Sequence, residues 1–146
     1  PTTFKGRPVV PGSVRAAALV SRGGFNTLAS FQKALMFNDK AAKCSDQNNP
    51  DLYGKAMSGT ALCLPRTVGS TTGGMVLYCA AALGRQPACM LFSEPIDSLA
   101  AAGAILADIW TDAAMPVVDG LGEAFLNAVQ TGAGIEVRAD GTVIVD

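Results

Sequence analysis

Short continuous runs of apolar residues alternate with segments of helical spacing through the second half of the chain. The continuous runs occupy residues 60–65 (TALCLP), 87–93 (PACMLFS) and 115–120 (MPVVDG). Runs of this length are typical of strands that are buried on both faces. Helical spacing follows in residues 73–83, closed by Gly84, in 97–110, with Asp97 or Ser98 as N-cap, and in 122–132, closed by Gly132. This alternation predicts a parallel sheet built from βαβ units.

The two ends of the chain predict additional β structure. Residues 13–21 (SVRAAALVS) are interpreted as a strand that the Pro11-Gly12 turn introduces. Residues 133–146 are interpreted as a hairpin with Asp140-Gly141 in its tight turn. Together with the alternating half, these additions predict a three-layer β/β/α domain with a parallel βαβ half and a C-terminal hairpin.

Two further segments have less definite patterns. Residues 23–37 begin as a glycine-led loop and continue as either a strand or a short helix. Residues 38–54 are polar and are interpreted as a long surface loop. Neither a linker nor an internal repeat occurs, so we expect a single domain over residues 1–146.

The composition indicates a folded domain and limits its partners. Hydrophobic residues make up 49% of the 146 positions and charged residues 16%, enough for one real core. The net charge is -1 and no basic run occurs, which argues against nucleic acid or an anionic membrane surface as the main partner. No apolar run reaches the roughly 18 residues that span a bilayer. The start, PTTFKGRPVV, has no signal-peptide h-region. We interpret Pro1 as following a removed initiator Met and expect a cytoplasmic protein.

The absence of histidine excludes several kinds of site. A Ser-His-Asp triad, a Cys-His pair and an HExxH metal site all need a histidine, and this chain has none. The four cysteines, at positions 44, 63, 79 and 89, form no CxxC pair. Three of them lie in apolar runs and are expected to be buried thiols. The fourth, Cys44, lies in a polar segment and could be exposed. We expect reduced thiols and no metal ligands within this chain.

The segment 69–74 (GSTTGG) is the main candidate for a binding loop. It connects an expected strand to an expected helix, and the unpaired N–H groups at a helix N-terminus bind anions readily. It is neither a Walker A loop, because no GK[ST] follows, nor a GxSxG elbow. A simple helix cap is the alternative. However, a cap needs one hydroxyl, whereas here three hydroxyls are flanked by three glycines that permit close backbone approach.

These residues carry a resemblance to a known family. The strings LYGKAMSGTALCLP, VGSTTGG and SEPIDSLAAAGAILADIW, within a match from VPGSVRAAALVS to MPVVDG, resemble the small, swivelling subunit of aconitase X, a branch of the aconitase superfamily. The family pattern is a strand ending in Leu-Pro, a Gly-Ser-x-Thr-Gly loop, a helix, and a helix with D-x-x-x-A-x-G. The resemblance covers most of the chain.

The resemblance implies a swivelling β/β/α domain that closes over an iron–sulfur cluster held by a separate large subunit. Members are dehydratases of small hydroxy acids, so the chain is expected to be a hydro-lyase subunit that is active only with its large subunit. The family's catalytic serine falls on Ser70, which would accept the α-proton. A serine is too weak a base unless positive potential from the helix N-terminus and partner cations activates it. Thr71 and Thr72, with the Gly69 and Gly73 amides, would hold the loop or the substrate carboxylate.

The chain departs from the family pattern at two places. Relatives often have the sequence Ser-Gly-Arg-Gly-Ser before the Thr-Gly of the loop, whereas here Pro65 is followed by Arg66-Thr67-Val68-Gly69, so the arginine has a different position. In addition, GGFNTLAS replaces a Ser-Phe-Trp-Gly-Gly loop of the relatives. We expect the second segment to face the same cleft, with Asn26 and Ser30 as substrate-binding residues. These departures resemble the branch that acts on cis-3-hydroxy-L-proline. The phosphomevalonate branch would need extra cationic groups for its phosphate.

Two alternatives stay open. The chain could be the small subunit of a phosphomevalonate dehydratase, or a non-catalytic module that binds a small anion with the same loop. Glu94 and Asp97 follow an expected strand, where open α/β sheets place ligands; for Asp97 we favour helix capping.

Overall fold

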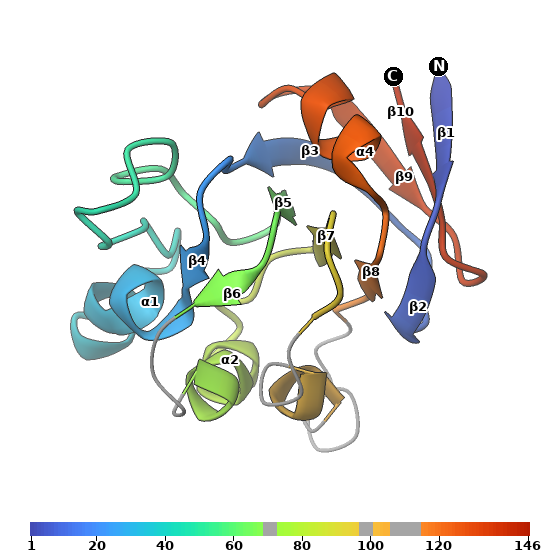
Figure 1. Ribbon diagram of the computed structural model, residues 1–146. Coiled ribbons are helices and arrows are strands. Elements are labelled where there is room, and N and C mark those ends of the chain that lie inside the picture. The colour runs from blue at the N-terminus through green and yellow to red at the C-terminus, as the bar shows by residue number, and fades with distance from the viewer. Residues whose placement is uncertain (69–72, 97–100, 106–114) are drawn as a thin grey trace.

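The computed structural model describes residues 1–68, 73–96, 101–105 and 115–146, and contains an eight-stranded sheet in the order β1-β10-β9-β3-β5-β7-β8-β2 (Figure 1). Its strands are β1 (Thr2–Lys5), β2 (Arg7–Val10), β3 (Val14–Val20), β5 (Ala61–Leu64), β7 (Cys89–Phe92), β8 (Val117–Asp119), β9 (Gly134–Val137) and β10 (Thr142–Val145). A small second sheet pairs β4 (Phe25–Asn26) with β6 (Thr67–Val68). The named helices are α1 (Thr27–Met36), α2 (Gly73–Ala82) and α4 (Glu123–Ala128).

The parallel half of the sheet agrees with the pattern of continuous apolar runs. Strands β3, β5, β7 and β8 are parallel neighbours. The hairpin β9–β10 adds antiparallel strands to β3, and the Asp140-Gly141 turn connects them, with Gly141 at a φ of 90°. The expected strands at 13–21, 60–65, 87–93 and 115–120 and the C-terminal hairpin are therefore confirmed.

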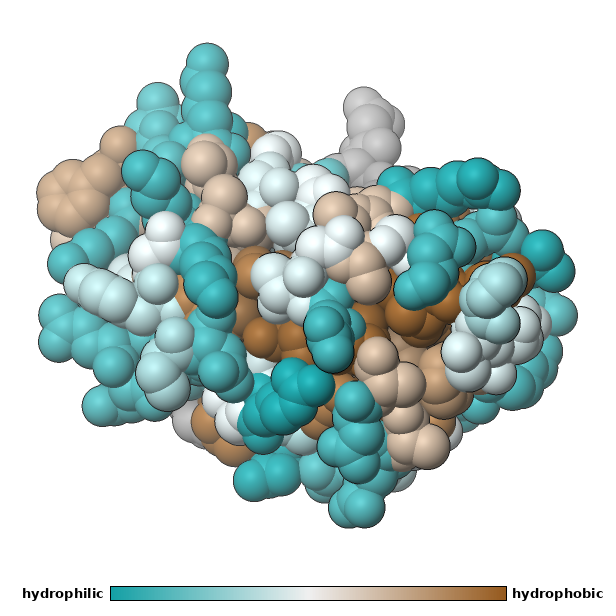
Figure 2. Space-filling model, turned by 90° about the horizontal axis from the view of Figure 1, so that it is seen from above, coloured by the Kyte–Doolittle hydropathy of each residue, from teal (hydrophilic) through white to brown (hydrophobic). Residues whose placement is uncertain are grey.

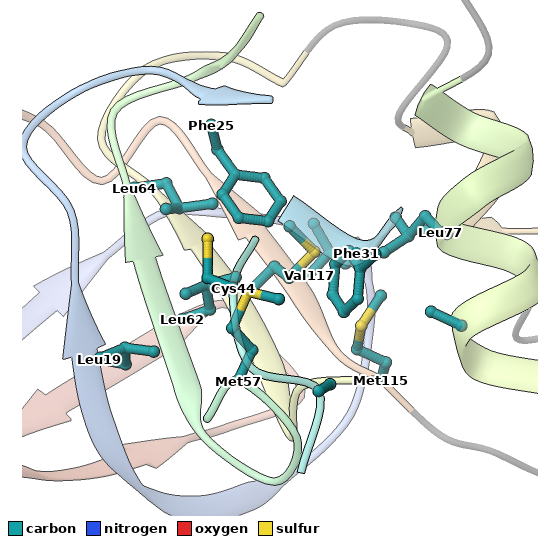
Figure 3. Close-up of a cluster of buried hydrophobic side chains, with 14 of the residues drawn as sticks. Leu19, Phe25, Phe31, Cys44, Met57, Leu62, Leu64, Leu77, Met115 and Val117 are labelled. Carbon is teal, nitrogen blue, oxygen red and sulfur yellow. The ribbon is translucent and has the colours of Figure 1, made fainter. Parts of the chain in front are cut away.

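Alternate side chains of the central strands point into two different cores. Leu62 and Leu64 of β5 belong to a core shared with α1 and α2, whereas Ala61 and Cys63 belong to a core shared with α4, β9 and β10. Figure 3 shows the first core, in which Leu62 and Leu64 lie opposite Phe31 and Leu77. Because both faces are covered, these strands lack polar alternation.

This arrangement is the three-layer β/β/α domain that the sequence predicts. Helices α1 and α2 cover one face of the central strands, while β9, β10 and α4 cover the other (Figure 1). On the outer side of β9, Glu136 pairs with Arg15 at 2.5 Å and with Arg138 at 2.7 Å. The view from above shows hydrophilic side chains surrounding a band of hydrophobic ones (Figure 2).

A single glycine joins the two edges of the large sheet. Strands β1 and β2 occupy opposite ends of the strand order although only Gly6 separates them in sequence. The Gly6 N–H donates to the carbonyl of Gly141 at 3.0 Å. A Cβ at this position would lie 2.5 Å from the carbonyl oxygen of Asp119. The sheet therefore folds back on itself at a point where no side chain fits.

Segment 38–54 is less exposed than its composition predicts. Cys44 and Leu52 are buried, at 2% and 0% exposure, so the expectation that Cys44 could be exposed is wrong. Several polar side chains here satisfy the loop's own backbone: Asp39 accepts from the N–H groups of Ala41 and Lys43, and Asn49 from that of Leu52. The polar side chains of this segment stabilise its turns, and the turns direct the apolar side chains between them into the core.

One expected helix is shorter than predicted, and another is only partly covered by the described residues. The helix expected over 122–132 ends at Ala128, because Val129 is extended and the Gly132 N–H donates to the carbonyl of Ala18 at 2.8 Å. Of the helix expected over 97–110, residues 101–105 are helical and the rest lies outside the described residues. The ambiguous segment 23–37 forms β4 and then α1. Within the described residues, no helix is long and apolar enough to cross a membrane.

Candidate functional site

The loops that follow the parallel strands meet at one edge of the sheet. Because β3, β5 and β7 are parallel, the segments after them, 21–26, 65–68 and 93–96, emerge on the same side. Backbone hydrogen bonds tie these segments together: Phe25 N–H to the carbonyl of Arg66 at 2.8 Å, Ser93 N–H to that of Leu64 at 3.0 Å, and Glu94 N–H to that of Pro65 at 3.1 Å. We call this side the carboxyl edge.

The small sheet β4–β6 places the start of α1 beside the end of β6 at this edge. Asn26 is in register with Val68, and α1 begins immediately after Asn26. A Cβ at Gly24 would lie 2.6 Å from Cγ1 of Val68, so the glycine permits the close approach of the two segments. The Asn26 side chain accepts a hydrogen bond from the Ala29 N–H at 3.0 Å, which caps α1.

Ser30 lies in the core. It is fully buried on α1, and its hydroxyl lies beside the thiol of Cys44. Burial raises the pKa of the Cys44 thiol, while the Asp46 backbone N–H and the nearby Ser30 side chain act in the opposite direction. Of the two substrate-binding residues expected in segment 23–30, Asn26 therefore lies at the carboxyl edge and Ser30 beneath it.

The candidate catalytic loop lies largely outside the described residues. Gly69, Ser70, Thr71 and Thr72 are not described, and the structure resumes at Gly73, the first residue of α2. The loop therefore connects the end of β6 to the start of α2. The roles assigned to these residues remain predictions.

An ion pair joins two of the loops at the carboxyl edge. Arg66 Nη1 lies 3.0 Å from Glu94 Oε2, and the two side chains are 55% and 48% exposed. Leu64 and Phe92 are register partners in β5 and β7. Arg66 follows Leu64 by two positions, and Glu94 follows Phe92 by two positions. The sequence shows a charged residue shortly after each of the two strands, but only the strand register shows that the two residues meet.

A second ion pair, in which the carboxylate is buried and the guanidinium exposed, supports the segment that carries Glu94. Asp119, at the end of β8, is 2% exposed and accepts from Arg7 Nη2 at 2.6 Å and Arg7 Nε at 3.0 Å. The same carboxylate accepts from the Ile96 N–H at 2.8 Å. Hydrogen bonding to Asp119 raises the pKa of the Arg7 guanidinium. No local sequence pattern indicated this contact, because it pairs residues 112 positions apart.

The cysteines do not form a metal site. Cys63 and Cys89 lie in the core between β5, β7 and α4, where burial raises the pKa of both thiols, that of Cys89 to about 12. Cys44 belongs to the other core, and Cys79 is partly buried on α2. In the part of the chain that the structure describes, no group of three His, Cys, Asp or Glu residues could hold a metal ion. These residues therefore do not fit an iron–sulfur cluster.

Comparisons with known proteins agree with this fold. A model of the aconitase X swivel domain matches residues 3–145. The phosphomevalonate dehydratase small subunit of Thermococcus kodakarensis is 29% identical over 137 residues, covering 94% of this chain and 90% of that protein. The protein of the same name from Methanocella arvoryzae is 32% identical over 145 residues, covering 98% and 92%.

A solved structure extends the similarity to three dimensions. The crystal structure of Thermococcus kodakaraensis aconitase X in its holo form matches with a TM-score of 0.83 and 27% identity, covering 100% of this chain and 99% of the matched chain. The three-layer fold and the family resemblance seen in the sequence are confirmed. The chain belongs to the aconitase X swivel domain family.

Proposed function

We propose that this chain is the small subunit of an iron–sulfur-dependent dehydratase that removes water from cis-3-hydroxy-L-proline, with Ser70 as the base. The observation that carries the general assignment is the family match over residues 3–145, together with relatives that are small subunits of a dehydratase. Such a subunit acts with a large subunit, which is the partner we assign. From the sequence we also propose that the complex is cytoplasmic.

The charges at the carboxyl edge support the choice of substrate. Arg66 precedes the candidate loop by three positions in the sequence. Its guanidinium is neutralised by Glu94, at 3.0 Å. A phosphorylated acid needs a surplus of cations to compensate its phosphate. A small amino acid carries no net charge and needs no such surplus. The charge balance of the Arg66–Glu94 pair therefore favours hydroxyproline.

The proposed base needs activation from its surroundings. Removing water from a 3-hydroxy acid requires a group that takes the α-proton and one that assists the leaving hydroxyl. Ser70 precedes α2, whose N-terminus at Gly73 provides positive potential. Further cations come from the large subunit in this proposal. Gly69, Thr71, Thr72 and Gly73 would position the loop or the substrate carboxylate, and Asn26 would contact the substrate.

The cluster is assigned to the large subunit. The cysteines of this chain are separated between two cores and α2, as described above, and three of the four are buried. An isolated small subunit is therefore expected to be colourless. Stoichiometric iron in the purified chain, measured after removal of any affinity tag, would contradict this assignment.

A second candidate function is dehydration of phosphomevalonate. It is favoured by the names of the relatives, among them proteins 29% and 32% identical to this chain. The third candidate is a non-catalytic module that holds a small anion.

The experiment that separates these candidates is co-expression with the gene for the large subunit, followed by anaerobic assay of the purified complex. We expect consumption of cis-3-hydroxy-L-proline and no dehydration of phosphomevalonate. The reverse result would establish the second candidate. No turnover of either acid by a complex that contains its cluster would favour the binding module.

A further inference from the structure

Arg66 and Glu94 present opposite charges side by side at the carboxyl edge. Their charged atoms are 3.0 Å apart, and about half of each side chain is exposed. Their backbones are fixed: the Arg66 carbonyl accepts from Phe25 N–H at 2.8 Å, and the Glu94 N–H donates to the Pro65 carbonyl at 3.1 Å. The pair is thus accessible to a ligand and rests on a rigid base.

The other charged groups near this edge have hydrogen-bond partners outside the Arg66–Glu94 pair. In the described segments 21–26, 65–68 and 93–96, the charged residues are Arg22, Arg66 and Glu94. The Arg22 guanidinium donates to the carbonyl of Val129, beyond the end of α4. Asp119 is buried beneath the edge and bound by Arg7. Arg22 is exposed as well, but in these described segments Arg66 and Glu94 are the two residues whose opposite charges lie side by side.

A partly exposed ion pair contributes little to the stability of a fold, but it is complementary to a zwitterion. A ligand with a carboxylate and an ammonium group can replace the Arg66–Glu94 ion pair by two new ion pairs, one with each residue. The guanidinium then binds the carboxylate through two hydrogen bonds, and the glutamate accepts from the ammonium. No charge is left uncompensated if a partner subunit then covers the site. A ligand with a second anionic group would instead place that group near Glu94 and be repelled.

We infer that Arg66 and Glu94 determine the substrate class of this site, with Arg66 binding the carboxylate of an amino acid and Glu94 binding its ammonium group. This inference rests on the proposed function, because it assumes that the small molecule binds at the carboxyl edge. It goes further by assigning the two charged groups of the substrate to two residues. It also gives Glu94 a selective role against phosphorylated acids.

Two ligands of nearly equal shape test the assignment by calorimetric titration of the assembled complex. L-Proline carries the carboxylate and the secondary ammonium, whereas cyclopentanecarboxylate has the same ring size and carboxylate but no nitrogen. We expect Glu94→Gln to weaken L-proline binding about tenfold or more and to leave cyclopentanecarboxylate within about twofold, because a charge-assisted hydrogen bond is lost only for the first ligand. Arg66→Gln should weaken both.

Glu136→Gln provides the matched control. Glu136 also forms surface ion pairs, with Arg15 and Arg138, but it pairs with the amino-terminal end of β3, opposite to the carboxyl edge. It should change neither affinity. Melting curves of all variants verify that the fold is retained.

The outcomes distinguish this inference from the proposed function. Equal loss of both ligands in Glu94→Gln, or loss of neither, would overturn the role of Glu94, even if the wild-type complex dehydrates hydroxyproline. A wild-type complex that binds neither ligand would overturn the inference as well. Selective loss of L-proline supports it, whichever acid the complex turns over.

Discussion

Arg7 and Asp119 are register partners in β2 and β8, and their side chains form a two-contact ion pair at 2.6 and 3.0 Å. The contact connects the start of the chain to the end of the last parallel strand. Through the Ile96 N–H, at 2.8 Å, the same carboxylate also holds the segment that carries Glu94. One buried carboxylate thus links the closure of the sheet to the geometry of the carboxyl edge.

Asp119→Asn should destabilise the domain, because an amide cannot accept from both donor groups with the strength of a carboxylate. The expected loss is about 1.5–3 kcal/mol in the free energy of unfolding, or roughly 4–10 °C in Tm for a chain of this size. Urea and thermal melts measure it. In addition, hydrogen exchange at the Ile96 amide should accelerate. A Tm shift no larger than that of Glu136→Gln, which affects exposed pairs, would contradict this role.

Gly6→Ala should destabilise the closure of the sheet. The added methyl would lie 2.5 Å from the Asp119 carbonyl oxygen, 2.6 Å from Val118 Cγ1 and 2.9 Å from Leu121 Cδ2. Because one of these atoms is backbone, the strands must separate, and overpacking of this kind costs about 1–3 kcal/mol. Gly23→Ala is the control, since a Cβ there meets nothing within 4 Å. Equal denaturation midpoints for the two variants would show that the closure tolerates a side chain.

The sequence predicted the interior strands because local pattern and tertiary environment agree there. Strands β5, β7 and β8 are covered on both faces, so each is a continuous apolar run. Strands β1 and β2 were not predicted. Most residues of β1 are exposed and β2 is only partly buried, and the two strands pair with β10 and β8, more than a hundred positions away. Edge strands of this kind depend on partners that no local window contains.

The grouping of the loops at one edge was predictable from the sequence, but the contacts between them were not. Parallel strands require that their following loops share one edge, and the structure places the segments around Asn26 and Glu94 there. The meeting of Arg66 with Glu94 depends on the register of β5 against β7, which apolar residues on both faces leave unspecified in the sequence. Ser30 shows the reverse case. A polar residue was expected in the cleft, whereas the helical turn of α1 directs it into the core.

The four thiols should react at very different rates. Burial raises the pKa of the Cys44, Cys63 and Cys89 thiols, which lowers their thiolate fraction and restricts access. Cys79 is the partly exposed one. At pH 8 we expect one thiol to react rapidly with an aromatic disulfide reagent and three to react only after addition of guanidinium. Mass spectrometry should place the rapid label on Cys79; rapid labelling of Cys63 or Cys89 would contradict the buried core.

Ser70→Ala should abolish turnover by the assembled complex while leaving assembly intact. Loss of a helix cap costs about 0.5–2 kcal/mol, which a domain with two cores survives. Loss of a general base lowers the rate of dehydration by roughly 10²–10⁴-fold. Thr71→Ala and Thr72→Ala are the matched controls, because they remove neighbouring hydroxyls. They should raise KM with a smaller effect on kcat, since we propose that they position the loop or the carboxylate.

The measurement that decides the role of Ser70 is the steady-state dehydration rate, together with Tm and the cluster absorbance of each complex. A rate above about a tenth of the wild-type value for Ser70→Ala is incompatible with a general base, and the hydroxyl would then serve as a cap for α2. If the alanine variant does not assemble, Ser70→Thr retains a hydroxyl and Ser70→Cys replaces it with a more acidic group. An assembled Ser70→Cys complex whose kcat rises toward higher pH, as its thiolate forms, would indicate that a base at this position takes the α-proton. A pH-independent rate equal to that of wild type would place the base elsewhere, on the large subunit.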